Sequence, residues 1–91
     1  MDQMVASDLE ALGLDVARQI AGADAVEQVS VTTDQDSDDR PVYRFSFLID
    51  PDRSQARMGL VRIRLRQTLR DALVARGDEH STVIQFLERA D

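Results

Sequence analysis

Apolar residues recur at helical spacing near the start of the chain. They lie three or four residues apart and therefore share one face of an amphipathic helix. This set is Val5, Leu9, Leu12, Val16 and Ile20. Ser7 and Glu10 have the spacing of a capping box, and Gly22 stands where a left-handed C-terminal cap is expected. Gly13 disfavours the helix by about 1 kcal/mol relative to alanine, so this first helix depends on packing.

Two segments with period-2 alternation follow. In the first, Val29, Val31 and Thr33 share one face, which is typical of a half-buried strand. In the second, the residues on one face are Tyr43, Phe45, Phe47 and Ile49. An acidic, turn-rich segment from Asp34 to Pro41 connects them. We predict an antiparallel hairpin.

The next segment is rich in arginine and predicts a second helix. Asp50 and Pro51 have the residue types of an N-cap and a first helical position. The apolar stripe consists of Met58, Val61, Leu65, Leu69, Ala72 and Leu73. Residues 61–66 also alternate as a strand would, but the helical period continues to Leu73 and ends before Gly77. We therefore favour a helix, which Gly59 can kink or split.

A short β-prone run from Thr82 to Leu87 completes the pattern. The predicted fold class is α+β: one domain, residues 1–91, forming a two-layer αββαβ sandwich with both helices on one face of a three-stranded sheet. This element order resembles ferredoxin-like domains and type II KH-like domains. A KH domain carries a Gly-x-x-Gly loop, whereas this chain has Ala56-Arg57-Met58-Gly59. We transfer no functional residue from either family.

Charge is distributed unevenly along the 91 residues, whose net charge is −6. All eleven basic residues are arginine. Residues 1–51 have a net charge of −8, residues 52–76 of +5 and residues 77–91 of −3. The absence of cysteine excludes disulfides and thiolate chemistry. Neither a secretory signal nor a long apolar run is evident, so we expect a cytoplasmic protein without membrane association.

The arginines of the predicted second helix form the main candidate site. On a helical projection Arg53, Arg57 and Arg64 line one flank, and Arg62, Arg66 and Arg70 line the other. Leu60 and Ile63 lie between these flanks, in a narrow apolar strip opposite the core stripe. Arginine stems could simply shield stray apolar residues. Arginine around apolar anchors is equally typical of a protein-binding surface.

Two other clusters have simpler interpretations. Asp34, Asp36, Asp38 and Asp39 suggest a calcium loop, but the positions of the required glycine and glutamate hold Asp39 and Phe45. We interpret this segment as a solvated turn. His80 is the only histidine, and no second histidine or cysteine completes a zinc site. We expect an ordinary loop histidine, no metal, no cofactor and no catalytic set.

These observations favour a non-enzymatic protein-interaction or regulatory module. It would bind a protein partner, or a second copy of itself, through the arginine-rich helix. The alternative is RNA or ribosome binding through the same arginines. An isoelectric point near 4.6 and few aromatic residues count against that alternative.

Overall fold

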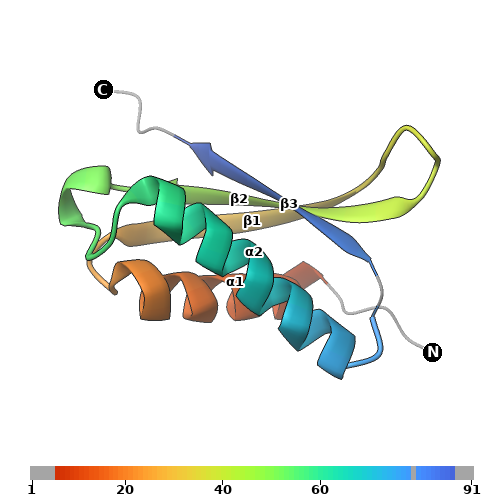
Figure 1. Cartoon of the computed structure of the whole chain (residues 1–91), viewed down its shortest axis with the longest axis horizontal. Coiled ribbons are helices and arrows are strands. Elements are labelled where there is room, and N and C mark those ends of the chain that lie inside the picture. Colours follow the sequence, from red (N-terminus) through yellow and green to blue (C-terminus); the bar gives the residue numbers. More distant parts are fainter. Residues whose placement is uncertain (1–5, 79, 88–91) are drawn as a thin grey trace.

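Two helices cover one face of a three-stranded sheet (Figure 1). The computed structural model describes residues 6–78 and 80–87. Its elements are α1 (Ala6–Ala21), β1 (Val26–Gln35), β2 (Pro41–Ile49), a 3-10 turn (Pro51–Arg53), α2 (Met58–Ala75) and β3 (Ser81–Leu87). The strand order is β1-β2-β3, with β1 antiparallel and β3 parallel to β2. The predicted α+β sandwich is confirmed.

The aromatic residues of β2 form the centre of the core. Tyr43, Phe45 and Phe47 are fully buried. Phe45 lies between Val31 of β1 and Ile84 of β3, because β2 is the middle strand. Alternation then directs all three aromatic side chains to the face that the helices cover. The predicted register of β2 is therefore confirmed.

Residues 60–66 are helical and not a strand. Val61, Leu65, Leu69 and Leu73 recur at every fourth position of α2 and have no exposed surface. Burial at that spacing requires helical geometry, because a strand would bury alternate residues. The arginines between these leucines point away from the core and are exposed.

The predicted start of this helix is wrong. Asp50 caps a three-residue 3-10 turn by accepting a hydrogen bond from the Asp52 backbone, and Pro51 begins that turn. The Ser54 hydroxyl then donates to the carbonyl oxygen of Ala56 and accepts from its amide. Such local side-chain bonds compete with helix formation. As a result α2 begins only at Met58, and Gly59 lies in its first turn without splitting it.

The first helix also differs from its prediction at one end. Ser7 lies inside α1 rather than capping it, because Ala6 is already helical. Val5 lies outside the described residues. The Glu10 carboxylate instead accepts a hydrogen bond from the Val31 amide of β1 at 3.4 Å. At the other end, Gly22 has φ +103° and caps the helix as predicted.

Candidate functional site in the groove between α2 and β3

One flank of α2 carries a ladder of arginines beside β3. Arg62, Arg66 and Arg70 are four residues apart and therefore lie one helical turn from one another. Arg62 Nη1 donates a hydrogen bond to the carbonyl oxygen of Ile84 at 2.7 Å. Its guanidinium also lies 4.7 Å from the ring centroid of Phe86, within the range of a cation–π interaction. These contacts hold Arg62, the first arginine of the ladder, against β3.

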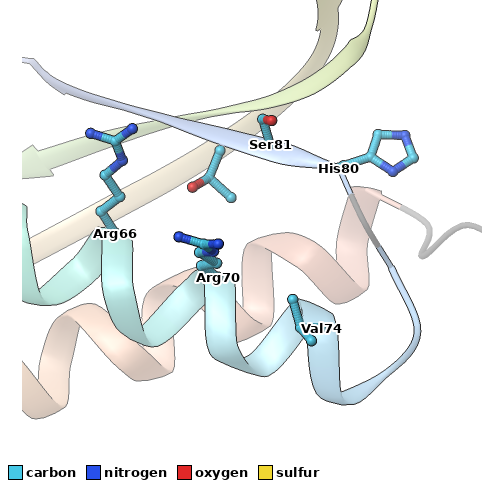
Figure 2. A pocket seen from close by; sticks show the side chains of 6 residues that line it. Arg66, Arg70, Val74, His80 and Ser81 are labelled. Atoms are coloured by element: carbon cyan, nitrogen blue, oxygen red, sulfur yellow. The ribbon is translucent and has the colours of Figure 1, made fainter.

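The space between α2 and β3 is hollowed. A hollow of about 300 Å³ is lined by Arg62, Ile63, Arg66, Thr82, Val83 and Ile84. A second, of about 500 Å³, is lined by Arg66, Arg70, Val74, His80, Ser81 and Thr82. Both include Arg66 and Thr82, so we treat them as one groove and call it the α2–β3 groove. Figure 2 shows Arg66 extending from α2 toward β3, with Arg70 on the next turn of the helix.

Among the described residues, no acidic side chain forms an ion pair with the arginines at the centre of this groove. Within residues 6–78 and 80–87, neither Arg66 nor Arg70 has an ion-pair partner. Two arginines away from the groove do form ion pairs: Arg44 contacts Asp34 at 3.0 Å, and Arg53 contacts Asp50 at 3.7 Å. Two adjacent guanidinium groups without a counter-charge favour the binding of an anionic group.

Leu60 and Ile63 of the predicted apolar strip on α2 are exposed, and so is Val74 further along the same helix. The exposed fractions are 42% for Leu60, 55% for Ile63 and 59% for Val74. Ile63 and Val74 also line the α2–β3 groove, whereas Leu60 does not. Exposed apolar residues next to arginines have the composition of an interface core and its rim.

The second predicted arginine flank does not form. Arg53 lies in the 3-10 turn and Arg57 has an extended backbone before α2. Only Arg64 of that set belongs to the helix, where the helical period puts it on the flank away from the ladder. The flank was predicted by extending the helical period to Pro51, and the helix begins too late for that. The site therefore consists of one ladder and not two.

Sequence reasoning missed a largely buried cluster of Tyr43, Asp78 and His80 at the start of β3. The Tyr43 hydroxyl donates to Asp78 Oδ2 at 2.6 Å. Asp78 Oδ1 lies 2.5 Å from His80 Nδ1, and the imidazole stacks on the Tyr43 ring at 4.2 Å between centroids. The side chains of Asp78 and His80 are only 8% and 12% exposed. His80 is thus a packed residue and not an ordinary loop histidine.

The ionisation of this cluster follows from its burial and hydrogen bonds. Burial, followed by the bond to Asp78 and its charge, raises the pKa of Tyr43 to about 12. Burial alone would raise the pKa of Asp78. Hydrogen bonds from Tyr43 and from the His80 backbone and side chain outweigh that effect and lower the Asp78 pKa below its ordinary value.

The cluster resembles a carboxylate–imidazole pair of the kind that orients catalytic histidines. The other imidazole nitrogen, Nε2 of His80, is shielded from solvent and has no hydrogen-bond partner among the described residues. In Figure 2 the imidazole projects away from Arg66 and Arg70. A general base must reach the proton that it removes, and this nitrogen does not face the groove. The arrangement favours a packing role, in which Asp78 and His80 anchor the loop before β3 to the core.

The acidic segment between β1 and β2 forms a tight turn. Asp36 Oδ1 accepts hydrogen bonds from the amides of Asp38 and Arg40, and Asp39 adopts φ 60°. These are the bonds of a side-chain-stabilised turn. Among the described residues, no group of three or more His, Cys, Asp or Glu side chains could hold a metal ion. No helix within the described ranges is long and apolar enough to cross a membrane.

No protein-family model matches this chain, and the searches of curated proteins and of solved structures likewise gave no match.

Proposed function

We propose that this chain is a non-enzymatic, cytoplasmic protein-interaction or regulatory module that binds its partner through the outer face of α2 and the α2–β3 groove. The observation that carries the proposal is the juxtaposition of exposed Ile63 with Arg66 and Arg70, which have no acidic partner among the described residues. Apolar anchors within a charged rim are the usual elements of a protein-binding surface.

The energetics favour a bound state for these residues. Ile63 and Val74 are each more than half exposed, and burying them in a complex removes apolar surface from water. The guanidinium groups gain charge-assisted hydrogen bonds if the partner supplies carboxylates. A helix face that stays in water gains neither contribution. Arg62 is already hydrogen-bonded to β3, so its side chain loses little conformational freedom when a partner binds.

RNA binding through the same ladder is the second candidate. The arginine spacing suits phosphates, but single-stranded RNA usually also requires exposed aromatic rings for stacking. Among the described residues, Tyr43, Phe45 and Phe47 are buried, and Phe86 is half-buried beneath Arg62. The net charge of −6 also repels a polyanion. These facts favour a protein partner.

Site-specific photo-crosslinking in the native cell tests the proposal. A photoreactive amino acid at Ile63 should capture a discrete protein, or a second copy of the chain, in a protease-sensitive adduct. The matched control is Ala11, an exposed position on α1, where the same probe should give no such adduct. Adducts that ribonuclease removes would support RNA binding instead. Equal capture at both positions, or none at Ile63, would contradict the proposed surface.

A further inference from the structure

We infer that the α2–β3 groove receives an extended, acidic segment of a partner protein, which adds to the free edge of β3 and places carboxylates on Arg66 and Arg70. This inference rests on the proposed function, because it requires a protein partner, and it specifies the chemistry of that partner.

The first argument is the free edge of the sheet. Among the described residues, β3 pairs with β2 on one side and with no strand on the other, since the strand order is β1-β2-β3. The Ile84 carbonyl accepts from Arg62 and so faces the outer edge. Backbone groups alternate along a strand, which puts the amide and carbonyl of Thr82 on the same edge. Thr82 lines both hollows of the groove, so an incoming backbone can reach its unpaired polar groups.

The second argument is the match of two repeats. The ladder follows β3 in the reverse direction, because Arg62 contacts Ile84 while Arg70 lines the hollow beside Ser81 and His80. Arginines four residues apart on α2 are separated by about 6 Å along the helix. An extended peptide repeats its side chains on one face about every 6.7 Å. Two carboxylates separated by one residue therefore match Arg66 and Arg70.

The third argument is that the occupant must be both a peptide and acidic. Only a polypeptide offers backbone groups in register with a strand edge. Alternation puts the side chain between its two carboxylates on the opposite face of the strand, beside Val83, which is 39% exposed. A guanidinium donates two parallel hydrogen bonds to a carboxylate, and neither Arg66 nor Arg70 has an ion-pair partner among the described residues.

A second copy of the chain is a poorer occupant of this edge. Antiparallel pairing of two β3 strands across a two-fold axis would put both α2 helices on one face of the joined sheet. The Arg66–Arg70 pairs of the two copies would then face each other and repel.

The test is an NMR titration of the intact ¹⁵N-labelled chain with the peptide acetyl-Thr-Val-Glu-Val-Glu-Val-Thr-amide. We expect saturable shifts at the Thr82 and Ile84 amides and at the Nε–H groups of Arg66 and Arg70. The same peptide with glutamine in place of glutamate should bind at least about tenfold more weakly, since each charge-assisted hydrogen bond contributes more than a neutral one.

Two double variants separate the groove from general electrostatics. Arg66→Gln with Arg70→Gln should weaken peptide binding about tenfold or more. Arg57→Gln with Arg64→Gln removes the same charge outside the groove and should leave the affinity within about twofold. Thr82→Pro should also weaken binding, because proline removes the outward amide while edge strands tolerate it. Circular dichroism verifies that each variant is folded.

Several results would overturn the inference. One is that the glutamine peptide binds as tightly as the glutamate peptide. Another is that the chemical-shift changes are confined to α1 or to the open face of the sheet. The third is that no saturable chemical-shift change occurs at millimolar peptide. Concentration-dependent shifts at Thr82 without peptide would assign the groove to a second copy. A different result is that a partner is still crosslinked at Ile63 in the Arg66→Gln, Arg70→Gln double variant. That result would support the proposed protein-binding function and contradict only the inference that the partner supplies an acidic strand.

Discussion

Tyr43 connects the aromatic core to the loop that begins β3. Its ring contacts Phe45 edge-on at 6.5 Å and stacks on His80 at 4.2 Å, while its hydroxyl donates to Asp78. A buried hydroxyl and a buried carboxylate each satisfy the other's hydrogen-bonding requirement, which avoids the cost of leaving either unpaired. The geometry of the loop at residues 78 and 80 is therefore coupled to the core through one side chain.

The Tyr43 hydroxyl should titrate near pH 12. Its folded-state pKa lies above the value of about 10 in unfolded chains, so it stabilises the fold below pH 10 and that contribution is lost as the pH rises toward 12. Tyr43 is the only tyrosine and the chain has no tryptophan or lysine. Tyrosinate absorbance therefore reports this group alone.

Asp78→Asn provides the matched comparison. It removes the charge and the strongest acceptor of the Tyr43 hydroxyl, so the Tyr43 pKa should fall, while burial keeps it above its ordinary value. On the acid side, the lowered Asp78 pKa adds stability that is complete above about pH 4 and is lost as the pH falls through the folded-state value. A Tyr43 that titrates near pH 10 in the folded protein would contradict the hydrogen-bonded cluster.

Two helical glycines show how local preference and packing differ between elements. Gly13 lies in α1 where an added Cβ would be 3.1 Å from Phe45 Cδ2 and 3.2 Å from Val29 Cγ1. Its absent side chain lets α1 approach the sheet closely. Gly59 lies in the first turn of α2, where an added Cβ would contact nothing within 4 Å. The same residue type is thus a packing requirement in one helix and only a local cost in the other.

Gly59→Ala should stabilise the protein and Gly13→Ala should not. Alanine gains about 0.5–1 kcal/mol over glycine in a helix, and position 59 has room for the methyl group. At position 13 that gain is opposed by the tight contacts with Phe45 and Val29, which lie on a packed core. Chemical denaturation of both variants measures the difference. A stabilised Gly13→Ala protein would show that α1 can move away from the sheet.

Element types could be predicted from the sequence, whereas the first residues of α1 and α2 and the cluster of Tyr43, Asp78 and His80 could not. Apolar residues recur at helical spacing in α2, as Leu65 and Leu69 do, and alternate in β2 around Phe45. Each spacing shows which face of the element is buried, so it predicts the element type. Asp50 followed by Pro51 is compatible with the start of an α-helix and equally with the start of a 3-10 turn. The hydrogen bonds of Ser54 to Ala56 favour the 3-10 turn, so α2 begins later. His80 stacks on Tyr43, which is distant in sequence. No local pattern could reveal that contact, although an Asp two residues before a His was visible.

At the scale of the whole molecule, the uneven distribution of charge favours some partners over others. Residues 52–76 carry a net charge of +5 in a chain of −6, and much of that positive charge lies on α2 beside β3. The negative remainder repels polyanions at long range, whereas the local ladder attracts a short acidic segment that it contacts directly. Polarity of this kind directs an approaching partner to one face.

Substitutions on this face should therefore affect binding to the crosslinked protein partner in two distinct ways. Ile63→Asp puts an unpaired charge at a buried contact and should weaken binding by on the order of 2–4 kcal/mol, mostly through faster dissociation. Arg57→Ala, outside the groove, should mainly lower the association rate and its dependence on salt. Surface plasmon resonance at two salt concentrations separates the two effects. RNA binding predicts the reverse order, because each lost arginine then removes a phosphate contact while Ile63 contributes little. If Arg66→Ala weakens binding more than Ile63→Asp and flattens its salt dependence, the face of α2 is a nucleic-acid surface and not a protein-binding one.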